Sequence, residues 1–214
     1  MNFLHFKPRF INLFFLQFLF VSCSLFEQQT ISSNPSVEAS RICLSAEGRG
    51  RLLVSGHKFL FNFSSALERE SSEWYMSLSF PLYGEETFLV SWDEKGLLNF
   101  DASFENKILK DKQRVDPEML HLFLKKWAAL IVEIDQLKKQ KNVDKSFDSE
   151  FNWTSSRRSL IAVSNLSKNE SIRLEFKNLI DSNYFGRYDI FMRSKGVEQV
   201  KLELIVRKCL EKAD

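Results

Sequence analysis

Few residues in this chain have the type and spacing that catalysis or metal binding requires. The three histidines, His5, His57 and His121, lack the paired spacing of a zinc site. The sequence contains no G-x-S-x-G nucleophile elbow and no glycine-rich phosphate loop. We therefore expect no enzymatic activity, no metal and no cofactor. A catalytic pair whose members lie far apart in the sequence stays an alternative.

The clearest chemistry is that of a thiol near the N-terminus. Lys7 and Arg9 precede an apolar run over residues 10–21, and Ser22 stands directly before Cys23. A charged start, an apolar middle and a small residue before the cut are the layout of a secretory signal. Residues 1–22 are therefore predicted to be a signal peptide.

The place of Cys23 directly after the predicted cut resembles a bacterial lipobox. The resemblance implies that Cys23 is a lipid attachment site and that the mature protein stays on a membrane. Acyl chains add about 0.8 kcal/mol per buried methylene, so several of them anchor a protein firmly. Ser24 stands where an aspartate retains lipoproteins in the inner membrane of some bacteria. The expected location is the bacterial outer membrane, facing the periplasm, with the leaflet left open.

The same segment has two other interpretations. An uncleaved transmembrane helix needs about 20 apolar residues, whereas this run is shorter and is interrupted by Asn12 and Gln17. The other interpretation is an ordinary secretory signal, with Cys23 lying near the cut by chance.

Two further cysteines, Cys43 and Cys209, remain if Cys23 carries lipid. An oxidising compartment permits a disulfide between them. It would join the first strand region to the last and stabilise the domain by about 4–5 kcal/mol in the chain-entropy model. Two separate buried thiols are the alternative.

The composition is that of one folded domain with balanced charge. The chain has 214 residues with 30 basic and 28 acidic side chains. Removing residues 1–22, which hold two basic residues and no acid, leaves a net charge of zero. Such a balance gives no reason to expect binding to nucleic acid. Residues 23–40 are polar and predict a lipidated N-terminus with a flexible tether, and residues 41–214 predict the domain. We expect a monomer.

Period-two alternation predicts antiparallel strands on both sides of one helix. The predicted strands cover residues 49–55, 57–63, 73–80, 87–92, 97–101, 159–163, 172–176, 187–192 and 197–207. Asp116 is a plausible N-cap and Pro117 suits the first helical position. Apolar residues then recur at three- and four-residue spacing to Ile134, so one face of this helix must cover something apolar. The fold class is mainly β, a curved antiparallel sheet forming an unclosed barrel with a helical lid.

The apolar faces of these elements have two interpretations. The first is a filled core, which aromatic alternation usually means. The second is the wall of a cavity for acyl chains, because a sheet that curves around a hollow can hold them. The candidate lining residues are Phe59, Phe61, Phe63, Trp74, Met76, Leu78, Phe88, Val90 and Trp92 from the strands, with Leu120, Phe123, Trp127 and Ile131 from the helix.

The order of elements resembles the outer-membrane lipoprotein receptor family LolB. Residues 74–84 (WYMSLSFPLYG) look like the strand and P-L-G turn of that family, and the closing strands are similar to its C-terminal sheet. The resemblance covers roughly residues 45–207. It implies a cavity that accepts lipoprotein acyl chains, delivered by a periplasmic lipoprotein carrier, and no enzymatic activity. It also implies a membrane-insertion role for Leu82, although Tyr83 separates Leu82 from Gly84 here.

Two functional hypotheses follow. The main one is an anchored lipoprotein that binds acyl chains of lipoproteins or other lipids and helps to place them in the outer membrane. The alternative is a structural or assembly lipoprotein of the envelope that uses the same scaffold to bind a protein partner. The former requires a hollow interior, whereas a packed interior with an exposed apolar surface favours the latter.

Overall fold

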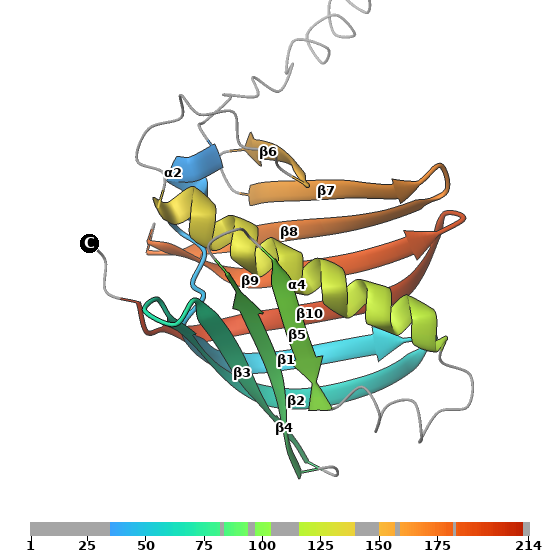
Figure 1. Ribbon diagram of the computed structural model, residues 1–214, viewed down its shortest axis with the longest axis horizontal. Coiled ribbons are helices and arrows are strands. Elements are labelled where there is room, and N and C mark those ends of the chain that lie inside the picture. Colours follow the sequence, from blue (N-terminus) through green and yellow to red (C-terminus); the bar gives the residue numbers. More distant parts are fainter. Residues whose placement is uncertain are drawn as a thin grey trace, which may run out of the picture. The chain divides into compact units, whose positions relative to one another are not determined.

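The computed structural model describes residues 35–81, 84–93, 97–103, 116–139, 150–156, 159–181 and 183–211. The fold is mainly β, with one ten-stranded antiparallel sheet in the order β5-β4-β3-β2-β1-β10-β9-β8-β7-β6 (Figure 1). The strands are β1 (Ala46–Val54), β2 (His57–Glu68), β3 (Glu73–Phe80), β4 (Gly84–Trp92), β5 (Leu98–Ala102), β6 (Asn152–Ser156), β7 (Ser159–Ser167), β8 (Glu170–Ile180), β9 (Tyr184–Ser194) and β10 (Val197–Cys209).

The sheet curls but does not close. Two runs of consecutive strands, β1 to β5 and β6 to β10, are joined where β1 pairs with β10. The strands at the two ends of this order are β5 and β6, and they have no pairing with each other in the described part of the chain. The predicted unclosed barrel is therefore confirmed.

Helix α4 (Pro117–Lys139) runs diagonally across the concave face of the sheet (Figure 1). Asp116 caps it as predicted, because its Oδ1 accepts hydrogen bonds from the amides of Glu118 at 3.0 Å and Met119 at 3.4 Å. Lys138 and Lys139 lie in its last turn, at the negative end of the helix dipole. None of the described helices is long and apolar enough to cross a membrane.

Two elements lie where the sequence predicted none. Helix α2 (Pro35–Ala39) falls in the predicted tether, and strand β6 falls in a polar stretch before the predicted strands resume. Ala39 is fully buried, and α2 contacts α4, β6 and β7. Folded structure therefore already includes Pro35, six residues before the predicted domain boundary at residue 41.

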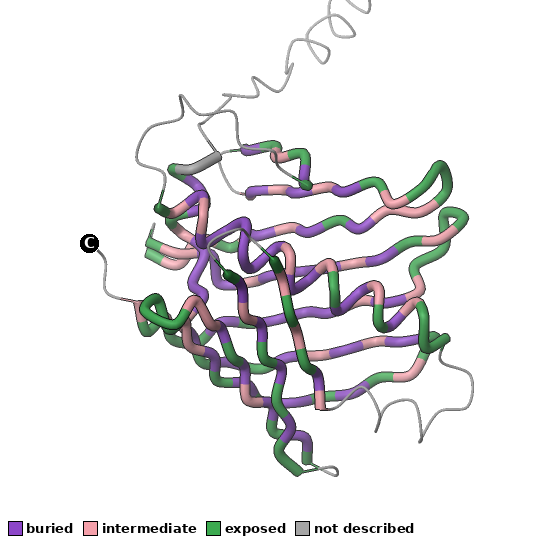
Figure 2. The backbone as a smooth tube through the Cα atoms, in the orientation of Figure 1, coloured by how far each residue is buried: buried purple, intermediate pink, exposed green. Residues whose placement is uncertain are grey.

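Burial alternates along the strands as the sequence patterns predict (Figure 2). In β2 the phenylalanines at 59, 61 and 63 are buried, and Lys58, Leu60 and Asn62 between them are exposed. The apolar buried side chains of each strand lie on the face that α4 covers, and the alternate positions form the convex face. All thirteen side chains predicted to line the interior are buried.

Two glycines in β1 lie opposite phenylalanines of β2. Gly48 pairs with Phe63, and Gly50 pairs with Phe61. A Cβ atom on Gly50 would lie 2.1 Å from the ring of Phe61, and one on Gly48 would lie 2.1 Å from the carbonyl oxygen of Ile205. The rings occupy the space that side chains would need, so aromatic side chains of β2 cover the glycine positions of β1.

We expect Gly48→Ala to destabilise the protein by about 3 kcal/mol or more, because a backbone carbonyl cannot move aside. Gly50→Ala should cost less, since the Phe61 ring can shift. Urea unfolding of both variants checks the order. Equal costs, or a larger cost for Gly50→Ala, would contradict this packing.

The convex face carries a group of ion pairs across β1, β8, β9 and β10. Glu203 pairs with Arg51, with Lys201 at 2.7 Å and with Arg187 at 3.3 Å. Asp189 is 2% exposed and pairs with Arg187 and Lys177, each at 3.0 Å. Burial, the largest single effect, raises the pKa of Glu203, but hydrogen bonds and charges from Lys201 and Arg51 together bring it below its ordinary value.

A carboxylate with a lowered folded-state pKa stabilises the protein above the unfolded-state pKa, and that contribution is lost as pH falls through the folded-state value. We therefore expect Glu203→Gln to cost about 1–3 kcal/mol at pH 7. This cost should shrink steadily below about pH 4.5. Urea unfolding of both proteins from pH 7 to pH 3 measures it. Glu85→Gln, an exposed position on β4, is the control, and a cost for Glu203→Gln that does not vary with pH would be the contrary result.

Candidate functional site

The candidate site is the space between α4 and the concave face of the sheet. Phe63, Trp74 and Met76 reach it from β2 and β3, and Trp127 and Ile131 reach it from α4. Trp127 is central, since its ring lies 4.6 Å from that of Phe88 and 5.9 Å from that of Trp74. These five predicted lining residues are brought together around one void.

That void is too small for an acyl chain. Its volume is about 30 Å³, enough for one or two water molecules, whereas ligand pockets have about 300–1,000 Å³. A second void of about 10 Å³ lies further along α4 and touches Phe61, Leu78, Phe123 and Trp127 from the predicted set. Neither of these two voids touches Phe59, Phe88, Val90, Trp92 or Leu120. With these two voids small and all thirteen candidate lining side chains buried, the described part of the interior fits the filled core of the first interpretation.

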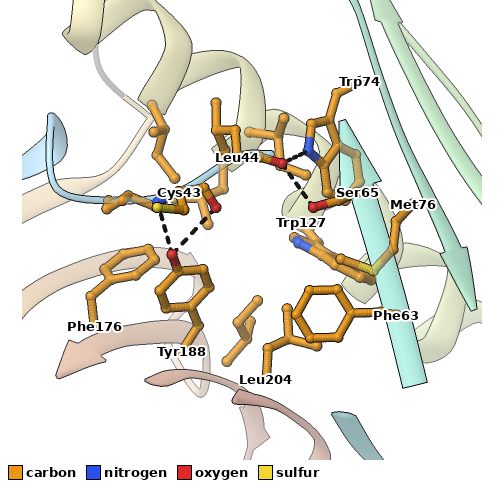
Figure 3. A pocket seen from close by; sticks show the side chains of 15 residues that line it. Cys43, Leu44, Phe63, Ser65, Trp74, Met76, Trp127, Phe176, Tyr188 and Leu204 are labelled. Carbon is orange, nitrogen blue, oxygen red and sulfur yellow. Dashed lines mark hydrogen bonds between the residues drawn. The ribbon is translucent and has the colours of Figure 1, made fainter. Parts of the chain in front are cut away.

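Residues 42–44, of which the sequence singled out Cys43 alone, as a disulfide partner, occupy one end of this interior. Ile42, Cys43 and Leu44 are buried and line the larger of the two voids. Figure 3 shows Cys43 and Leu44 beside it. We call this segment the plug. It precedes β1 and has no hydrophobic period of its own, so only the arrangement of the neighbouring strands reveals its position.

Side chains from three strands hold the backbone of the plug. Trp74 Nε1 donates to the carbonyl of Leu44 at 2.7 Å, and Ser65 Oγ donates to the same oxygen at 2.8 Å (Figure 3). The amide of Cys43 donates to the Tyr188 hydroxyl at 2.8 Å, and that hydroxyl donates back to the Cys43 carbonyl at 3.3 Å. Burial raises the pKa of Tyr188 far above its ordinary value. The hydroxyl therefore stays protonated at neutral pH and keeps both bonds.

The C-terminal end of the domain fixes the plug from the other side. A disulfide joins Cys43 to Cys209, with 5.7 Å between their Cα atoms. The Glu211 carboxylate accepts hydrogen bonds from the amides of Leu44 and Ser45, and it pairs with Lys138 of α4 at 2.5 Å. Burial lowers the pKa of Lys138, and the negative charge of Glu211 opposes that shift. The disulfide and the carboxylate thus connect the plug to β10 and to α4.

The remaining predicted sites cannot be placed. Cys23 and Leu82 lie outside the described residues. The strands that flank Leu82 are paired up to Phe80 and Gly84. Among the described side chains, no group of three or more His, Cys, Asp or Glu could hold a metal ion.

Comparison with known proteins gives distant structural matches alone. No protein-family model matches the sequence, and no curated protein matches it. The crystal structure of MucB matches with a TM-score of 0.39 and 10% identity, over 85% of this chain and 58% of that one. The crystal structure of MucB in complex with MucA(peri) matches with a TM-score of 0.35 and 9% identity, over 80% of this chain and 52% of that one. The structure of the Pseudomonas aeruginosa MucA/MucB complex matches with a TM-score of 0.35 and 10% identity, over 80% of this chain and 53% of that one.

This chain therefore spans little more than half the length of the MucB chains that it matches. The resemblance to the LolB family stays a prediction.

We expect Tyr188→Phe to destabilise the protein by about 1–3 kcal/mol, because it leaves the buried amide of Cys43 without its acceptor. Tyr75→Phe is the matched control, since the Tyr75 ring is exposed on the convex face and should cost less than about 0.5 kcal/mol. Urea unfolding measures both free energies. Equal values for the two variants would show that Tyr188 does not hold the plug.

Proposed function

We propose that this chain is a lipid-anchored protein of the bacterial envelope that binds a partner protein on the outside of its half-barrel. The observation that carries the proposal is the filled interior. The space that acyl chains would need is taken by the aromatic side chains of β2 and β3, by α4 and by the plug. Binding then falls to the outer surfaces. The anchor rests on the sequence around Cys23.

An apolar contact for a partner exists on the convex side of β3 and β4. Tyr75 and Leu89 are direct cross-strand neighbours, and they are 41% and 39% exposed. Their neighbours on the same face of these strands are polar, among them Ser77, Thr87 and Ser91. An aromatic and an aliphatic anchor inside a polar rim is the arrangement found at interface centres.

A second candidate function is the acyl-chain acceptor of the main sequence hypothesis. One observation favours it: both voids lie directly beneath α4 and have almost wholly apolar linings. If α4 and the plug moved away, the sheet would offer a continuous apolar wall. This function requires a second conformation, in which the plug hydrogen bonds and the Lys138–Glu211 pair are broken.

Two measurements on the full-length protein separate these functions. Titration with a fluorescent fatty acid should show no saturable binding, and native mass spectrometry should show no copurified acyl chain. In cells, a photoreactive amino acid at position 75 or 89 should give a discrete protein adduct. The matched control carries the same group at Lys125, which is exposed on α4. Saturable fatty-acid binding without an adduct would reject the partner proposal in favour of the acyl acceptor.

The double variant Tyr75→Ala with Leu89→Ala sharpens the test. Both side chains are partly exposed on the convex face, so their truncation should leave the interior and the plug intact. We expect it to abolish an adduct formed from a photoreactive group at a neighbouring position such as Ser77. An adduct that persists in the double variant would show that the partner does not depend on the side chains of Tyr75 and Leu89.

A further inference from the structure

Basic residues of the sheet are concentrated on five of its ten strands. Strands β3, β4 and β5 contain no lysine or arginine, and their charged residues are all acidic: Glu73, Glu85, Glu86 and Asp101. Strands β6 and β7 contain no charged residue. Every lysine and arginine of the sheet therefore belongs to β1, β2, β8, β9 or β10.

Strand register arranges many of these charges in three rows on the convex face. The middle row runs Arg51, Glu203, Asp189, Glu175 across β1, β10, β9 and β8. One flanking row contains Lys201 and Arg173, and the other contains Arg49, Arg187 and Lys177. Lys58 of β2 stands beside this group, across from Leu53 of β1. We call these seven basic residues and their three acids the basic face; its formal charge is seven minus three, or +4.

Two of the three acids of the basic face lie beneath its cations. Asp189 and Glu203 are 2% and 7% exposed. Their carboxylates are neutralised by Lys177, Arg187, Lys201 and Arg51, whose side chains reach over them. Arg49, Lys58 and Arg173 are exposed and have no ion pair with other residues in the described ranges. A molecule approaching this face therefore meets mainly positive charge.

We propose that the basic face docks on an anionic bilayer surface. The cations spread across five strands at about 4.8 Å per strand, and they lie on a convex surface, so they suit a broad layer of negative charge better than a single acidic segment. Leu60 and Ile205, exposed among them, add apolar contact.

The inference rests on the proposed lipid anchor for its setting. Eleven residues lie between Cys23 and Pro35, and the twelve steps that this makes, at about 3.6 Å each, keep the domain within about 43 Å of the membrane. At that range, attraction by a few charges is enough to choose which face turns toward the lipid, because the anchor has already removed most of the cost of association. The acidic strands β3 to β5, with Tyr75 and Leu89, then turn away from the negative surface and stay open to a partner.

Chemical footprinting of the full-length protein on vesicles tests the orientation. The vesicles contain phosphatidylcholine alone or with phosphatidylglycerol, and acetylation of each lysine is read by mass spectrometry. Lys58 reports on the basic face, and Lys139 of α4 is the reference. We expect phosphatidylglycerol to lower Lys58 labelling relative to Lys139 by about threefold or more, and high salt to restore it.

Two charge-reversal variants test whether the basic face itself is responsible for the protection of Lys58. Arg173→Glu changes an exposed residue of the basic face, and Lys125→Glu makes the same change on α4. The first should remove at least half of the Lys58 protection, and the second should leave it unchanged. Equal effects would show that overall charge, rather than this face, attracts the lipid, and the inference would be overturned.

Flotation of the same samples separates this inference from the anchor. Protein that floats with phosphatidylcholine vesicles but shows equal Lys58 labelling on both lipids keeps the anchor and overturns the basic-face docking. Protein that floats with anionic vesicles alone, with Lys58 protected, supports the docking and contradicts the anchor. Protection of Lys58 in intact cells but not on anionic vesicles would assign the face to an acidic protein and overturn the inference.

Discussion

An open sheet of ten strands leaves a large apolar concave face that must be covered, and the rest of this structure depends on that requirement. The helix α4 crosses this face, with Leu120, Phe123, Trp127 and Ile131 buried against the strands. One helix is too narrow to seal the ends of such a trough. The plug covers one end with Ile42 and Leu44, and it brings backbone amides and carbonyls into an apolar region. Those groups must be hydrogen-bonded there, which explains why Trp74, Ser65 and Tyr188 each point a polar atom at it.

The regular elements could be predicted because each carries its own period. Alternation in β2 and β3 fixed which side chains are buried, and Asp116 followed by Pro117 marked the start of α4. Strand β6 could not be predicted, since its sequence, Asn-Trp-Thr-Ser-Ser, has little apolar content and it pairs with a single neighbour. The positions of the plug backbone and of the Tyr188 hydroxyl could not be predicted for a different reason. Their roles depend on contacts between residues 145 positions apart. Whether the interior is filled or hollow depends on side-chain packing between α4 and the strands, which periodicity does not report.

The filled interior and the uneven charge of the sheet give the concave and convex sides of the sheet different roles. The concave side supplies stability, with rings such as Trp127 and Phe88 in direct contact. The convex side differs along its length, with ion pairs and exposed cations on β1 and β8 to β10 and with acids and an apolar pair on β3 and β4. A curved sheet points these two regions in different directions (Figure 1). One continuous surface can therefore face a membrane with one part and a protein with another.

The disulfide also determines how the domain bears a mechanical load. A pull on the chain ahead of Pro35 would reach α2 first and would break its contacts with α4, β6 and β7. It would then meet Cys43, three residues before β1 begins, where a covalent bond passes the force to Cys209 at the end of β10. Because the force passes through that covalent bond first, it does not open the hydrogen bonds between β1 and β10 one by one. The cross-link thus transfers tension on the N-terminal chain to the end of β10, before that tension reaches the pairing of β1 with β10.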